Sequence, residues 1–381
     1  MATQVPTVDS AVRVRRRHPA LSIAKWTGIG LLSALLLILA FLVWLNTDPG
    51  RRYIVSQINA FETASGLQVH VGRIEGSVFG DLILHDLALS DPRGIFFRAP
   101  TAELDYRPLS YLRNHIDIES LIIPEARLHR LAELRAPDPN APLLPDIDID
   151  VGRLRIARLL VDPPVTGRRH LLSIDSQIRI ADGRARVGLD LAALTAPGIA
   201  GGDQLRLRLD AVPEANRLGL GFAVRAPGNG FVAGLLGVDR PIVALVEGQG
   251  DWAAWRGRAR AMLGGQGLAD LAITGRDGTF TVQGPVRPGL LMSGPVERLA
   301  GPTTLVNLVT TFENRRADLR LRAASGALAV AAEGLVDLGQ NRFENLRVAT
   351  RLLQPGVANG PLTTSANCTS RPRRLGAIAP G

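Results

Sequence analysis

The side chains that could act in catalysis or bind a metal are few and scattered in this sequence. The six histidines show no spacing typical of a metal site, and the closest approach to an acid–base pair is His85 beside Asp86. Neighbouring residues on a strand point to opposite faces, so we predict that this pair is structural. Cys368 is the only cysteine, which excludes a disulfide framework and any multi-cysteine metal site. We therefore expect a protein that is not an enzyme and that has no cofactor and no metal.

Three short motifs resemble functional sites, but each has a plainer interpretation. Residues 76–80 (GSVFG) lack the central serine of a nucleophile elbow, and the only lysine, Lys25, stands outside any phosphate-binding loop. Residues 145–150 (PDIDID) lack the glycine and distal glutamate of a calcium loop, so solvated charge is the preferred interpretation. Trp252 and Trp255 either stack on a ligand or anchor a turn, and anchoring is the commoner role.

The segment from Trp26 to Leu45 is twenty residues long and contains no charge. A helix of this length measures roughly 30 Å, which matches the hydrocarbon core of a bilayer. Tryptophan at each end suits the headgroup level of the membrane. We predict a transmembrane helix over residues 21–45, with these anchor residues: Trp26, Leu31, Leu35, Phe41 and Trp44.

The flanking charges predict the orientation of this helix. Five cations precede it, whereas only Arg51 and Arg52 follow it closely. The positive-inside rule places residues 1–20, a basic tail, in the cytoplasm and the bulk of the chain beyond the membrane. A cleaved signal peptide is the alternative. The apolar run is longer than the usual roughly 7–15 residues and FLVWLNTDPG offers no small-residue cleavage site, so a retained single-pass anchor is favoured.

The net charge of +9 does not indicate a nucleic-acid partner. Residues 1–60 carry a net +5 and residues 355–381 a net +3, so the body between them is almost neutral. A surface that binds phosphate backbones needs a concentrated positive charge. The excess instead belongs to the two ends of the chain.

The period of the apolar residues changes after the predicted span. Residues 46–66 predict a short amphipathic helix, with Asp48 as N-cap and Pro49 at the first helical position, which either lies on the bilayer or caps the next element. Residues 67–130 then alternate with a period of two between Gly and Pro turns, which indicates a first β section. Residues 131–150 predict a loop, and residues 151–354 a second, more regular β section. Residues 231–241 predict a short helix within it and residues 294–312 a further helix-like run, while residues 355–381 predict a disordered or aberrant tail.

The predicted fold class is mainly β: an elongated, curved antiparallel sheet with a few short helices. Strict alternation makes one face of such a sheet wet and the other dry. From alternation alone the default is a closed β-sandwich core that buries the dry face, and only the predicted anchor and the family resemblance given below favour an open trough. We predict that the dry face lines an apolar groove formed by these residues: Leu205, Leu207, Leu209, Leu218, Leu220, Phe222, Leu319, Leu321, Leu328 and Val330.

The order of span, helix and β repeats resembles a known family. Residues 50–58 (GRRYIVSQI), 71–130, 248–265 (GQGDWAAWRGRARAMLGG), 276–291 and 317–338 are similar to the inner-membrane subunit of the translocation and assembly module (TamB), in the wider AsmA-like group. The resemblance covers roughly residues 10–354. It implies an inner-membrane protein with a periplasmic, taco-shaped β structure, serving phospholipid transport between the envelope membranes, assembly of outer-membrane β-barrel proteins, or both.

The same resemblance implies three partners: phospholipid acyl chains, the inner membrane, and an outer-membrane barrel-assembly partner. Family members are usually several times longer and reach that last partner through a C-terminal domain that has no match here. We therefore expect a shortened chain. The alternative function is a closed β scaffold of the envelope that binds only proteins.

Overall fold

The structure is a computed structural model that describes residues 33, 36–37, 39–135, 147–212, 215, 217–251, 253–291, 295–313, 316–337 and 342–353. The chain divides into two units, Met1–Ile54 and Val55–Gly381. The helices are α2 (Asp48–Ala60), η1 (Pro108–Arg113), α3 (Pro163–Thr166), α4 (Phe231–Leu235), η2 (Pro288–Leu290) and α5 (Pro295–Ala300). The strands are β1 (Gln68–His70), β2 (Arg73–Gly76), β3 (Asp81–Asp91), β4 (Gly94–Tyr106), β5 (His115–Leu128), β6 (Asp148–Val161), β7 (His170–Ala181), β8 (Arg184–Leu194), β9 (Gln204–Val212), β10 (Arg217–Ala226), β11 (Ile242–Asp251), β12 (Trp255–Leu263), β13 (Gln266–Arg276), β14 (Thr279–Val286), β15 (Thr304–Glu313), β16 (Arg316–Ala324), β17 (Leu328–Asp337) and β18 (Arg342–Leu352).

The first unit contains the end of the predicted span. Residues 39–45 are helical, and Trp44 stacks on Phe41 with ring centroids 5.8 Å apart. The predicted anchor residues Trp26, Leu31 and Leu35 lie outside the described residues, as do the tails 1–20 and 355–381. Within the part of the chain that the structure describes, no helix has both the length and the apolar character needed to cross a bilayer.

Helix α2 occupies the region of the helix predicted over residues 46–66. The helix begins at Asp48 itself, one residue earlier than predicted, so Asp48 is the first helical residue and not the cap before it. Its carboxylate oxygen Oδ1 lies 3.8 Å from Nη1 of Arg51. At the other end of α2, the Asn59 side chain accepts a hydrogen bond from the Val71 backbone N–H at 2.8 Å and donates one to its carbonyl at 3.1 Å. These two bonds attach the C-terminal end of α2 to the first strands.

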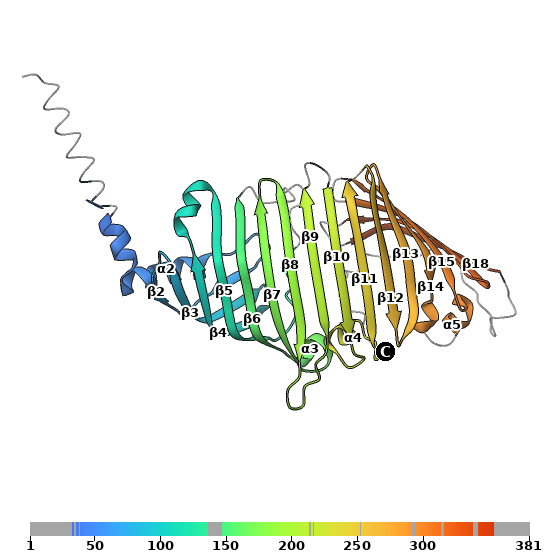
Figure 1. Cartoon of the computed structure of the whole chain (residues 1–381), viewed down its shortest axis with the longest axis horizontal. Helices are drawn as coiled ribbons and strands as arrows, with labels where there is room; N and C mark the ends of the chain where they lie inside the picture. Colours follow the sequence, from blue (N-terminus) through green and yellow to red (C-terminus); the bar gives the residue numbers. More distant parts are fainter. Residues whose placement is uncertain are drawn as a thin grey trace, which may run out of the picture. The chain divides into compact units, whose positions relative to one another are not determined.

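The second unit is one long, open and curved sheet (Figure 1), which confirms the predicted fold class and not the closed core that alternation alone would favour. From β3 to β18 each strand pairs with its neighbours in the sequence, and β1 and β2 both pair with β3. The two predicted β sections are therefore parts of a single sheet. Its edges are formed by β1 and β2 at one end and β18 at the other.

One strand pair departs from the antiparallel prediction. Strands β5 and β6 run parallel, with His115 opposite Asp148 and Leu128 opposite Val161. Parallel neighbours need a connection of a dozen or more residues, because the chain must return to the same end of the sheet. The segment predicted as a loop over residues 131–150 supplies that connection, except that its last three residues already belong to β6.

The two helices predicted inside the second section have different outcomes. Helix α4 forms within residues 231–241, as expected. The helix-like interpretation of residues 294–312 is wrong beyond Ala300, because Thr304–Glu313 is strand β15. Gly301 adopts a φ of 63° and Pro302 follows it, a combination that ends a helix. The β-branched residues that come next favour a strand.

Fully buried apolar side chains gather where short helices cover the strand ends. Ala233 of α4 packs with Ala226, Ile242 and Leu263, which end or begin strands β10, β11 and β12. The Asp203 carboxylate accepts hydrogen bonds from the backbone N–H groups of Phe231 and Val232 at 3.0 and 2.9 Å, and so starts this helix. Away from these ends the middle of each strand has no helix packed on it in the described residues.

Candidate functional site

The strand register places one continuous apolar row across the middle of the sheet. Residues directly opposite each other in antiparallel strands share a face. From β8 to β13 the row runs Leu189, Leu207, Phe222, Val246, Ala259 and Leu271. From β13 to β17 an adjacent row runs Ile273, Val282, Leu308, Leu321 and Ala332. We call the surface that carries these rows the apolar face.

All ten residues predicted to line a groove lie on the apolar face. Leu205, Leu207 and Leu209 of β9 stand opposite Val224, Phe222 and Leu220 of β10, and Leu319 and Leu321 of β16 have the equivalent place further along. Every one of the ten is half-buried, neither sealed in a core nor fully exposed. The structure thus places on one face side chains that lie up to 125 positions apart in the sequence. Their role as a groove lining stays a prediction.

The opposite surface, which we call the charged face, carries cross-strand ion pairs. Arg258 donates two hydrogen bonds to Asp270 at 2.8 and 2.7 Å, and these lower the pKa of that carboxyl group. The hydrogen bonds from Arg206 and Arg208 likewise lower the pKa of Asp190. Exposed pairs of this kind contribute little stability each. Their effect is to keep this face wet, in contrast with the apolar face.

The Trp255 side chain packs on the apolar face near one end of strand β12. This side chain is 4% exposed, and its Nε1–H donates to the Leu218 carbonyl at 2.8 Å. Its ring meets the Phe280 ring edge to face at 5.8 Å. A Cβ placed on Gly248 would lie 2.1 Å from the indole, so the ring occupies a slot that exists because glycine has no side chain. Trp255 is therefore an anchor and not a ligand platform; Trp252 lies outside the described residues.

The remaining sequence candidates form no reactive cluster. Among the described residues, no group of three His, Cys, Asp or Glu side chains could hold a metal ion. His85 Nε2 lies 3.0 Å from the Glu75 carboxylate on the neighbouring strand. Of the PDIDID run, Asp148 and Asp150 belong to β6, and Asp150 faces Arg179 at 3.5 Å, which fits surface charge.

The structure reveals a buried histidine, His170, that no pattern in the sequence indicates. His170 is 1% exposed and lies edge to face against Phe231 at 5.7 Å. Burial lowers its pKa, and the nearby Asp203 carboxylate opposes that shift. Because β7 and α4 lie sixty residues apart in the sequence, spacing alone does not predict this contact. His170 therefore lies in a packed region at one end of its strand, where helix α4 covers it, and does not line a pocket.

A buried carboxylate, Asp91, predicts how acid affects stability. The Asp91 carboxylate is fully buried and accepts two hydrogen bonds from Arg130 at 2.6 Å, together with backbone N–H groups of Arg93 and Glu133. Arg130 and these donors hold the pKa of Asp91 far below its ordinary value, although burial opposes them. A depressed folded-state pKa gives stability that is present above the unfolded value and is lost as the pH falls below about 4.

We therefore expect the Asp91→Asn variant to be less stable than the wild type at pH 7 and to lose less stability on acidification. Thermal unfolding followed between pH 2.5 and pH 7 measures both effects. Equal acid slopes in the two proteins would show that Asp91 does not contribute to the acid dependence.

Comparison with known protein families, curated proteins and solved structures finds no match to this chain. The functional conclusion therefore rests on the geometry of the sheet.

Proposed function

We propose that the protein is a membrane-anchored carrier whose apolar face binds lipid acyl chains and guides them along the sheet. The observation that carries the proposal is the continuous half-buried apolar face from β8 to β17, which no second layer covers in the described residues. An open sheet of this kind leaves its dry side accessible. A closed core would not.

The exposure of individual side chains supports a curvature in which the apolar face is the concave side of the sheet. Apolar side chains on the charged face are well exposed, including Leu305 at 64%, Met262 at 42% and Leu245 at 37%. The ten groove candidates are all less exposed than these. Side chains crowd together on the inside of a bend and splay apart on the outside, so the difference is expected if the curvature in Figure 1 encloses the apolar face.

The free energy of lipid transfer explains why such a face is useful. Removing an acyl chain from a bilayer into water costs about 0.8 kcal/mol per CH₂, on the order of 10 kcal/mol per chain. An apolar surface replaces the lost contacts and lowers that cost. Neighbouring strands lie about 4.8 Å apart, so the ten strands β8–β17 carry a path of about 43 Å. A chain on this path keeps apolar contacts on its protein side throughout.

The cellular setting of the proposal comes from the sequence. The apolar segment 26–45 and its flanking charges favour a single-pass anchor with the sheet on the non-cytoplasmic side, which the resemblance identifies as the periplasmic side of an inner membrane. The resemblance to the TamB and AsmA-like proteins supports phospholipid transport, assembly of outer-membrane proteins, or both. Contact with an outer-membrane partner is part of the same proposal. A protein-binding scaffold without lipid is the second candidate, because a half-exposed apolar sheet also suits an unfolded protein client.

Photocrosslinking from adjacent residues tests the proposal. We expect a photoreactive phenylalanine derivative at Leu207, on the apolar face, to capture phospholipid when the full chain is irradiated in intact cells. The same derivative at Arg206, on the charged face one position away, is the matched control and is expected to capture none. Mass spectrometry of the purified chain identifies the adduct. Equal lipid yields at the two positions, or only protein adducts at Leu207, would reject lipid carriage, and the second result would favour the scaffold.

A further inference from the structure

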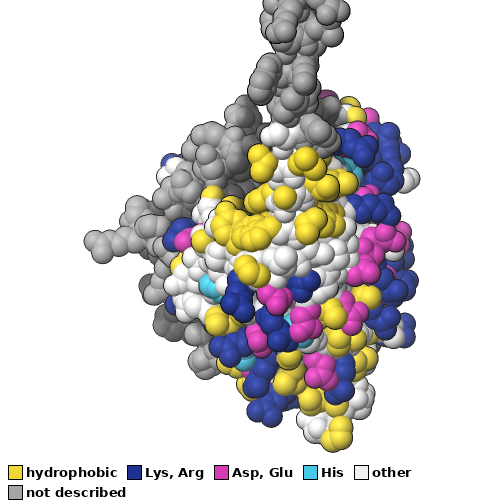
Figure 2. All heavy atoms as spheres, turned by 90° about the vertical axis from the view of Figure 1, so that its left-hand side faces the viewer, with side chains coloured by type: hydrophobic (Ala, Val, Ile, Leu, Met, Phe, Trp, Pro, Cys, Tyr) yellow, Lys and Arg dark blue, Asp and Glu magenta, His cyan; other side chains and the backbone are white. Residues whose placement is uncertain are grey.

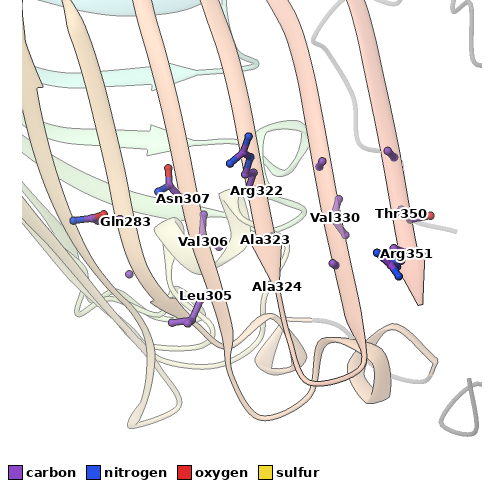
Figure 3. A pocket seen from close by; sticks show the side chains of 14 residues that line it. Gln283, Leu305, Val306, Asn307, Arg322, Ala323, Ala324, Val330, Thr350 and Arg351 are labelled. Atoms are coloured by element: carbon purple, nitrogen blue, oxygen red, sulfur yellow. The ribbon is translucent and has the colours of Figure 1, made fainter. Parts of the chain in front are cut away.

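A hollow on the charged face interrupts the pattern of ion pairs near the last strands (Figure 3). It has a volume of about 720 Å³, within the range of small-molecule sites. Its floor consists of alanines from three strands, each with a side chain on the charged face: Ala324, Ala329, Ala331 and Ala349. Longer side chains surround this floor, among them Leu305, which is 64% exposed. The result is an apolar depression in an otherwise charged surface.

The charges around this hollow have one sign. Arg322 and Arg351 are exposed and line it from β16 and β18, while its other polar lining residues are uncharged. No carboxylate belongs to the lining, although elsewhere this face pairs arginine with aspartate. Within the described part of the chain, neither arginine forms an ion pair, in contrast with Arg320, which lies 3.6 Å from Asp318. Two available cations therefore stand beside an apolar floor.

We propose that this hollow binds an amphiphile with a single alkyl chain and a carboxylate head, the class of a long-chain fatty acid. The alkyl chain lies on the alanines and against Leu305, and the head accepts hydrogen bonds from Arg322 and Arg351. From Leu305 of β15 to the alanine of β18 the hollow crosses three strand spacings, about 14 Å, which suits an extended chain. Among the described lining residues none is aromatic, so these residues offer no stacking platform of the kind that a nucleotide base would use.

The side chains proposed to hold the ligand lie on the charged face, although the lining also includes Val306, Ala323 and Val330, whose side chains the register places on the apolar face. Arg322 and Ala331 are directly opposite each other on the charged face, whereas Leu321 and Ala332 form the corresponding pair on the other side of the sheet. The proposal therefore does not depend on lipid carriage. Each can fail while the other holds.

A photoreactive palmitate analogue tests the site on the full chain in membrane vesicles. We expect labelled peptides from residues 316–353, with labelling reduced by added dodecanoate but not by dodecyl maltoside, which has the same alkyl chain and an uncharged head. The double variant Arg322→Ala/Arg351→Ala is expected to weaken dodecanoate competition about tenfold, the effect of losing a charge-assisted hydrogen bond. Ala331→Trp, which fills the floor, is expected to abolish the labelling.

Arg320→Ala is the matched control, since it removes a cation from the same strand and face outside the hollow. It is expected to leave labelling and competition unchanged. If dodecanoate and dodecyl maltoside reduced the labelling equally, the assignment of a carboxylate head would be overturned. Labelling that survives Ala331→Trp, or labelling confined to the apolar face around Leu207, would overturn the site. Substitution of Leu207 by glutamate is expected to leave labelling of the hollow intact, which separates this result from a failure of the proposed function.

Discussion

Replacement of Trp255 by alanine is expected to lower the free energy of unfolding by about 3–5 kcal/mol, the usual cost of deleting a large buried aromatic side chain. The indole fills the slot above Gly248 and Gly257, hydrogen-bonds the Leu218 carbonyl and packs against Phe280. Its loss leaves a cavity at the margin of the apolar face and an unpaired carbonyl. Chemical denaturation measures the change, and hydrogen exchange in β10–β13 locates it.

The reciprocal substitution, Gly248→Ala, gives this prediction a direct check. An added methyl group would lie 2.1 Å from the indole, so the ring must move and the variant is expected to be clearly destabilised. In the Trp255→Ala background the same substitution is expected to cost little, because the two sites share one slot. Gly267→Ala is the control, since nothing lies within 4 Å of its added methyl. Additive effects of Gly248→Ala and Trp255→Ala would contradict the proposed packing.

Placing a charge in the middle of the apolar face is expected to stop lipid transfer along it. Ala259 of β12 stands between Val246 and Leu271 in the apolar row. An arginine there would put a cation in the path, and an alkyl chain passing it would lose its apolar contacts. We expect the Ala259→Arg chain to keep its lipid crosslinks at Leu207 but to lose those at Leu321, if lipid enters from the N-terminal end. Loss of the crosslinks at Leu207 with those at Leu321 retained would show that lipid enters from the C-terminal end.

The matched variant places the same charge on the other side of the sheet. Ala272 of β13 lies on the charged face, opposite Arg258, and its substitution by arginine is expected to leave both crosslinks unchanged. Circular dichroism of both variants checks that the sheet is formed. Unchanged crosslinking at both positions in Ala259→Arg would show that lipids do not travel along this face, even if single lipids bind to it.

The sequence predicted the two faces of the sheet well, because side chains alternate between the two faces along each strand. The leucines of β9 and β16 fall on one face by their parity alone, and antiparallel pairing carries that parity from strand to strand. The arginines between them occupy the other face for the same reason. Local alternation is sufficient for this assignment.

Other features depend on contacts between distant residues, which a local pattern does not contain. The slot for Trp255 needs glycines from β11, β12 and β13, and the burial of His170 needs α4, sixty residues further along. The parallel pairing of β5 and β6 and the strand in place of a helix at β15 were also missed, since a long connection or a short apolar run fits more than one structure. The hollow at Ala331 appears only when β14–β18 lie side by side. Thus the sequence by itself determined which face of the sheet is apolar, because alternation is a local property. The tertiary structure decided where Trp255 packs, where short helices cover the strand ends and where the hollow forms, because register and curvature arise from pairing across the whole chain.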